Sequence, residues 1–156
     1  MQRVFINVDL VLLTQFEPIA KPPGMEVILE ISELESLYNI EEPLKIARKW
    51  REMGYQFAIE DFGAGFVSLP FIAQLVPEYI KVDRSTILHA LSSEMFRDFF
   101  KDIILSLKKY TSGGFIAEGM EAVAEGVETQ KELEVVRELG IYLAQGFSLG
   151  RPDELT

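Results

Sequence analysis

The sequence predicts an α/β fold with about six parallel strands and outer helices, because two kinds of segment alternate along the chain. Short apolar runs, typical of strands buried on both faces, alternate with longer stretches whose apolar residues recur at helical spacing. Polar residues gather at the C-terminal end of each apolar run, as they do around the site of an α/β barrel. A closed eight-stranded barrel usually needs at least about 200 residues. A chain of 156 residues therefore predicts an open sheet or a barrel that lacks two strands.

Six segments are expected to form strands, and four are expected to form helices. The expected strands are residues 3–10, 26–33, 55–63, 78–83, 121–128 and 142–147, and the expected helices are residues 41–54, 68–76, 88–110 and 129–140. In the first helix, Ile46, Trp50 and Met53 fall on one face, and Gly54 is expected to end it. Residues 14–24 contain three prolines and are expected to form a loop.

Composition excludes several classes of function. The chain has 15 basic and 25 acidic residues, a net charge of −10, which argues against binding DNA or RNA through the phosphate backbone. There is no cysteine and one histidine, His89, so thiolate sites and multi-histidine metal sites are excluded. A metal would be held by carboxylate and amide oxygens, which suits magnesium, manganese or calcium. No apolar run is long enough for a membrane span and no signal-peptide pattern is present, which predicts a cytoplasmic protein.

Oxygen-bearing side chains at the ends of four expected strands are the candidate metal ligands. They are Asn7, Glu30, Glu60, Asp61 and Glu125, and Lys81 adds a cation from a further strand. Clustered carboxylates repel one another, and a divalent ion relieves the repulsion, acidifies bound water and can clamp a phosphoryl group. The alternative is that these are ordinary polar residues at loop boundaries, because single charged residues are mostly exposed.

Two local patterns add to this candidate site. The segment DFGAGFVSL (residues 61–69) has glycines that let the backbone approach a ligand closely, although a plain turn is the alternative. Residues 117–121 and 124–128 are near copies of each other, AEGME and AEGVE. Only the second copy runs into a helix start with a capping pattern, Thr129 and Glu132.

Segments in a fixed order carry a family resemblance: INVDL, LEISE, IEDFGAGFVSL, YIKVDRS, AEGVETQKELEVVRELG and AQGFSLGRP. Over essentially the whole chain they resemble the motifs of the EAL domain, the family of cyclic di-GMP phosphodiesterases. The resemblance implies a modified TIM (β/α) barrel that binds cyclic di-GMP at its C-terminal face. Active members hydrolyse it to linear pGpG with two magnesium or manganese ions.

The same resemblance implies roles for individual residues. It makes Asn7, Glu30, Glu60, Asp61 and Glu125 metal ligands, and it assigns catalytic roles to Lys81, Glu125, Glu128 and Gln145. Lys81 would position the attacking water or the phosphate, Glu128 would support its loop, and Gln145 would orient metal-bound water. Glu118 and Glu121 of the first copy belong to an insertion.

Three departures from the family pattern limit the expected activity. The name-giving Glu-Ala-Leu segment is absent, Glu60 replaces an aspartate, and the stretch between Asn7 and Glu30 is about nine residues short. Residues 1–156 are therefore expected to form a single EAL-like domain that lacks the first two barrel strands. Its uncovered sheet edges predict a homo-oligomer or a partner segment.

Three hypotheses stay open at this point. One is metal-dependent hydrolysis of cyclic di-GMP, weak or lost in this chain alone. The second is a non-catalytic module that binds cyclic di-GMP or another protein. The third is a fragment of a larger signalling enzyme that has no function of its own.

Overall fold

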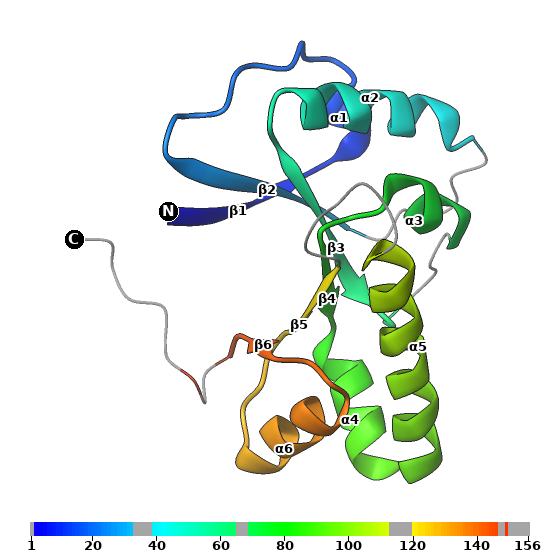
Figure 1. Cartoon of the computed structure of the whole chain (residues 1–156). Coiled ribbons are helices and arrows are strands. Elements are labelled where there is room, and N and C mark those ends of the chain that lie inside the picture. Colours follow the sequence, from blue (N-terminus) through cyan, green and yellow to red (C-terminus); the bar gives the residue numbers. More distant parts are fainter. Residues whose placement is uncertain (1, 33–38, 65–68, 113–119, 147–148, 150–156) are drawn as a thin grey trace. The chain divides into compact units, whose positions relative to one another are not determined.

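The computed structural model describes residues 2–32, 39–64, 69–112, 120–146 and 149. Within these ranges six strands alternate with helices (Figure 1). The strands are β1 Gln2–Val8, β2 Met25–Ile31, β3 Gln56–Phe62, β4 Tyr79–Val82, β5 Glu121–Ala124 and β6 Leu143–Ala144. The helices are α1 Leu10–Leu13, α2 Glu41–Glu52, α3 Leu69–Leu75, α4 Arg84–Ser92, α5 Glu94–Ser112 and α6 Gln130–Glu138.

The strands follow one another in the sheet in chain order, β1-β2-β3-β4-β5-β6. The pairs β1–β2, β2–β3 and β5–β6 are parallel. Parallel neighbours need a crossover connection, and a helix stands between most successive strands. The predicted alternation and the predicted number of strands are confirmed.

The chain divides into two compact units, Met1–Tyr79 and Ile80–Thr156. In the first unit β2 is buried along most of its length, and Ile28 and Phe57 are fully buried. The aromatic ring of Phe5 on β1 meets that of Tyr79, which begins β4, at 5.4 Å between centroids. Since β2 and β3 lie between them in strand order, this face of the sheet curls inward.

Helix α2 buries a different stripe from the one predicted. Leu44, Ala47 and Trp50 are buried, whereas Met53 is exposed, so the prediction that Met53 shares the buried face is wrong. Trp50 instead packs edge-on against Tyr55, the residue that follows the turn. The stop at Gly54 is confirmed, because its φ of +92° is left-handed and suits glycine.

Two further predictions need correction. The strand expected over residues 3–10 ends at Val8, because the Asp9 carboxylate caps a short helix, α1, that was not predicted. The loop expected over residues 14–24 is confirmed. The single helix expected over residues 88–110 is two helices, because Ser93 is extended (φ −137°, ψ 112°) between them. Its hydroxyl accepts a hydrogen bond from the Phe96 N–H, which favours a new helix start there.

No helix in the described ranges has both the length and the apolar character that crossing a membrane requires. The expected strands over residues 121–128 and 142–147 are shorter in the structure, and the residues beyond β5 form the loop that precedes α6.

Glu78 joins β3 to the segment before β4, and its removal is expected to destabilise the first unit. Its carboxylate accepts a 2.7 Å hydrogen bond from the buried Phe57 N–H and pairs with Arg51, which also donates to the Leu75 and Val76 carbonyls. Glu78→Ala leaves a buried donor unsatisfied and should lower the free energy of unfolding by about 2 kcal/mol.

Urea denaturation measures this loss. Glu42→Ala is the matched control, because Glu42 and its partner Lys45 are exposed and such pairs contribute about 0.5 kcal/mol. Equal losses in the two variants would contradict the role given to Glu78.

Candidate functional site

In the first unit, strand register places three of the predicted metal ligands on one face of the sheet. Asn7 on β1 stands opposite Glu30 on β2, and Glu30 stands opposite Ala58 on β3. Side chains alternate between the two faces, so Glu60, two residues after Ala58, shares the face of Asn7 and Glu30. All three lie near the C-terminal ends of their strands.

The Asn7 amide contacts the Glu60 carboxylate. Its nitrogen donates to Glu60, 2.6 Å from Oε2 and 3.3 Å from Oε1. The Ser32 hydroxyl adds a long hydrogen bond, 3.4 Å, to Glu60 Oε2.

Glu30 is buried, with 4 % of its surface exposed. Burying a carboxylate costs free energy unless it is paired, bonded or metal-bound. By its register, Glu30 adds this buried carboxylate to the face that carries Asn7 and Glu60. Oxygen donors of this kind fit a hard divalent cation such as Mg²⁺, Mn²⁺ or Ca²⁺.

Asp61 leaves the strand pattern. Its φ of +52° is left-handed, which is uncommon for a residue other than glycine and is a feature that gathers at functional sites. Regular alternation would turn Asp61 away from the face of Glu60, and this backbone conformation changes the direction of its side chain. Asp61 is exposed at the turn, where its carbonyl accepts from the Ala64 N–H. Residues 65–68 of the glycine motif lie outside the described residues.

The second unit brings Lys81, Glu125 and Gln145 together. Lys81 Nζ on β4 lies 2.8 Å from Glu125 Oε1, and the Gln145 amide donates to the same oxygen at 3.1 Å. Lys81 is buried, so its ammonium group needs the paired carboxylate. Glu125 follows β5 directly and Gln145 follows β6, so the two again mark the C-terminal ends of adjacent strands.

Backbone contacts fix the two loops that carry Glu125 and Gln145. The Glu125 N–H donates to the Val82 carbonyl, and the Val127 N–H donates to the Gln145 carbonyl. Gly146 has no room for a side chain, because a Cβ there would lie 2.3 Å from the Val127 carbonyl oxygen. The loop after β5 therefore runs directly against the loop after β6.

The two copies of the repeated motif take different places. Glu125, in the second copy, follows β5 and contacts Lys81, whereas Glu121, in the first copy, begins the same strand and is exposed. Glu118 lies outside the described residues.

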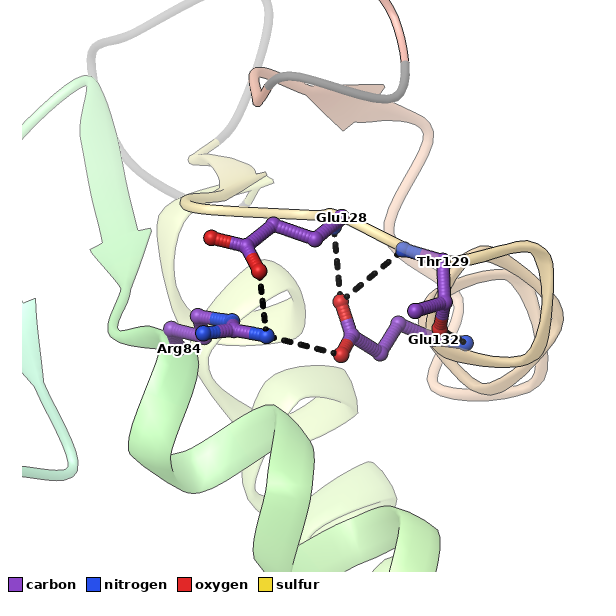
Figure 2. A network of polar contacts seen from close by, with 4 residues as sticks. All are labelled: Arg84, Glu128, Thr129 and Glu132. Carbon is purple, nitrogen blue, oxygen red and sulfur yellow. Dashed lines mark hydrogen bonds and ion pairs between the residues drawn. The ribbon is translucent and has the colours of Figure 1, made fainter.

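Glu128 takes part in a network that the sequence pattern did not reveal (Figure 2). Arg84 Nη2 lies 2.8 Å from Glu128 Oε2 and 3.2 Å from Glu132 Oε1. The Glu132 carboxylate is buried and accepts from the Glu128 and Thr129 N–H groups, and the Thr129 hydroxyl completes the predicted capping box. Arg84 stands in the motif YIKVDRS, yet its partner Glu132 is 48 residues away, and nothing local indicates the contact.

Burial raises the pKa of the Glu132 carboxyl, but hydrogen bonds from the Glu128 N–H, the Arg84 guanidinium and the Thr129 N–H outweigh it. The net effect holds the pKa of Glu132 below its ordinary value of 4.5.

Within the described residues, no three carboxylate or imidazole side chains lie close enough together to hold a metal ion. The structure brings Asn7 to Glu60 in the first unit, and Lys81 to Glu125 and Gln145 in the second. The five-ligand metal site, which includes the Asn7 amide, stays a prediction.

A profile of the EAL domain matches residues 12–152, which is most of the chain. The chain belongs to the EAL domain family. All the predicted site residues except Asn7 fall within the matched residues. The fold class predicted from the sequence, an α/β incomplete barrel of about six parallel strands, is confirmed.

Known relatives and structures agree with this assignment. The chain is 31 % identical to the cyclic di-GMP phosphodiesterase PdeB of Shewanella oneidensis, over 85 % of this chain and 15 % of PdeB. It is 34 % identical to the cyclic di-GMP phosphodiesterase NbdA of Pseudomonas aeruginosa, over 80 % of this chain and 15 % of NbdA. Both relatives are thus several times longer than the matched segment.

Among solved structures, a manganese and cyclic di-GMP complex of Klebsiella pneumoniae BlrP1 superposes with a TM-score of 0.75 at 25 % identity. The similarity covers 93 % of this chain and 38 % of that one.

The lowered pKa of Glu132 predicts an acid-sensitive contribution to stability. A carboxyl whose pKa is lower in the folded state stabilises the protein above its unfolded pKa, and this contribution is lost as pH falls through the folded pKa. The contribution of Glu132 is therefore complete above about pH 4.5 and declines below it.

Unfolding by urea between about pH 7 and about pH 3 measures this decline, and Glu132→Gln should make the stability fall less steeply with acid. Equal slopes in the wild type and the variant would contradict the assignment.

Proposed function

We propose that the chain is part of a cytoplasmic cyclic di-GMP signalling protein and binds cyclic di-GMP at the C-terminal ends of its strands. The observation that carries this proposal is the contact of Lys81 with Glu125 and Gln145, residues that the EAL motifs bring from three strands. The names of PdeB and NbdA and the ligands of the BlrP1 complex support the choice of nucleotide.

In this proposal divalent ions, Mg²⁺ or Mn²⁺, join the nucleotide. Their ligands would be Asn7, Glu30, Glu60, Asp61 and Glu125, all of which offer the oxygen atoms that hard cations prefer. When bound, such ions supply an acidified water and offset phosphate charge. That offset matters here, because a net charge of −10 repels a cyclic dinucleotide.

The residues of the chain itself would position the phosphate. Lys81 is a fixed cation, because burial and the Glu125 carboxylate restrict its ammonium group. Gln145 donates to the same carboxylate oxygen and so limits how Glu125 can turn. Glu128 would support this loop through Arg84.

We expect hydrolysis to pGpG to be weak or absent in this chain alone. Glu60 has one more methylene group than the aspartate of the family pattern, and a misplacement of about 1 Å in a reacting constellation can cost about 10²-fold in rate. The sequence also lacks a Glu-Ala-Leu tripeptide. We propose a single domain without the first two barrel strands.

A second candidate is a non-catalytic module that binds cyclic di-GMP or a protein. The exposure of β1 favours its protein-binding form, because β1 is an edge strand of the described sheet and Phe5 and Ile6, on opposite faces, are both more than a third exposed. Uncovered edge strands pair readily with other chains. We propose that a second copy of the chain or a partner segment covers this edge.

Calorimetry with cyclic di-GMP and Mn²⁺ tests the proposed binding, and Glu125→Gln is the decisive variant. Removing the carboxylate takes away the negative charge that pairs with the buried Lys81 ammonium, so binding should weaken by at least about tenfold. Glu121→Gln is the matched control, since Glu121 stands at the other end of β5 and is exposed. The affinity of Glu121→Gln for cyclic di-GMP should equal that of the wild type.

Incubating the wild type with the same nucleotide and metal, and assaying for pGpG, separates the two functions. Robust turnover would contradict the expected loss of activity. No binding heat at high nucleotide concentration would rule out both nucleotide-binding functions and leave only a protein-binding role.

A further inference from the structure

Glu132 makes more contacts than a helix cap requires. In a capping box the carboxylate reaches back to the N–H of the N-cap residue, here Thr129. The Glu132 carboxylate does so at 3.3 Å, but it lies closer, at 2.7 Å, to the N–H of Glu128, the residue before the cap. Its other oxygen contacts Arg84, which belongs to a different helix (Figure 2). One buried carboxylate thus ties two elements and a loop together.

These contacts complete the fixation of the segment between β5 and α6. The Glu125 N–H donates to the Val82 carbonyl and the Val127 N–H donates to the Gln145 carbonyl. The two following N–H groups, of Glu128 and Thr129, both donate to Glu132 Oε2. One side chain therefore supplies half of these four backbone anchors.

Arg84 also contacts the segment between β5 and α6. Gly126 has a left-handed φ of +67°, and a Cβ there would lie 3.1 Å from the Cβ and Cδ atoms of Arg84. The aliphatic part of Arg84 thus lies against Gly126, while its guanidinium contacts Glu128 and Glu132. Arg84 is also only three residues after Lys81, so the contact links the Lys81 strand to the Glu125 loop.

We propose that Glu132 and Arg84 are positioning residues, which fix residues 125–129 and thereby hold the Glu125 carboxylate against Lys81 and Gln145. Neither residue needs to touch a ligand for this role. The expected effect of these two residues on nucleotide binding rests on the proposed function. Their expected effect on the conformation of residues 125–129 does not.

Amide hydrogen exchange without nucleotide tests the positioning role directly. In Glu132→Ala, the N–H groups of residues 125, 127 and 128 should exchange at least about tenfold faster than in the wild type, because their anchors are lost or loosened. The matched control is Thr129→Ala. It removes the other half of the capping box, the hydroxyl that accepts the Glu132 N–H, and leaves both bonds to Glu132 Oε2 in place.

The two variants separate positioning from helix capping. If Glu132 acts only as a cap, both variants should weaken α6 and leave the loop amides equally protected, which would overturn the proposal. If it positions the loop, Glu132→Ala should release these amides and Thr129→Ala should not. Affinity for cyclic di-GMP with Mn²⁺ should then fall by at least about tenfold in Glu132→Ala and stay at the wild-type level in Thr129→Ala.

Arg84→Met keeps the test decisive if Glu132→Ala does not fold. Methionine keeps an aliphatic stem beside Gly126 and removes the guanidinium, so the same amides should lose protection by a smaller factor. Wild-type protection in Arg84→Met would overturn the role of Arg84.

The two proposals fail in distinguishable ways. A wild type that does not bind cyclic di-GMP, with loop amides released in Glu132→Ala, contradicts the proposed function and supports the positioning role. A wild type that binds cyclic di-GMP, with loop amides that stay protected in Glu132→Ala, supports the proposed function and contradicts the positioning role.

Discussion

Strand register is the constraint on which the candidate site depends. Because side chains alternate along a strand and parallel neighbours are held in step, the pairing of Asn7 with Glu30 and of Glu30 with Ala58 decides what shares a face. A shift of one residue in β3 would remove Glu60 from the face that carries Asn7 and replace it with an apolar or differently directed side chain. The chemistry of this region therefore follows from backbone hydrogen bonding and from the apolar packing that fixes it.

Buried charge is the second constraint, and it explains why the loops are so closely tied. Lys81, Glu30 and Glu132 are all less than 5 % exposed, and charged groups this deep are stable only with partners. Lys81 has Glu125, and Glu132 has Arg84 and two backbone N–H groups. Exposed pairs such as that of Glu42 and Lys45 contribute little by comparison. Lys81 and Glu132 must keep these partners to remain stable as buried charges. This requirement restricts the segment between β5 and α6 to a defined conformation.

Sequence reasoning predicted much of this, and its failures have physical causes. The apolar runs predicted all six strands. The polar residues near the ends of these runs predicted Lys81 and Glu125 as site residues, and the two form an ion pair in the structure. The break between α4 and α5 was missed because Ser93 sits in an otherwise continuous helical pattern, which hides its capping role. The contact between Arg84 and Glu132 was missed because it depends on tertiary packing, which periodicity does not encode.

The central claim is that the ends of β1, β2 and β3 place their oxygen atoms for a divalent cation. Titrating the isotopically labelled protein with Mn²⁺ and following paramagnetic broadening by NMR tests this claim most directly. The account predicts that the Asn7 side-chain amide and the backbone signals of Glu30 and Glu60 broaden first, at the lowest Mn²⁺ concentration. Broadening that begins instead at exposed carboxylates, such as Glu41 and Glu42 at the start of α2, would contradict it.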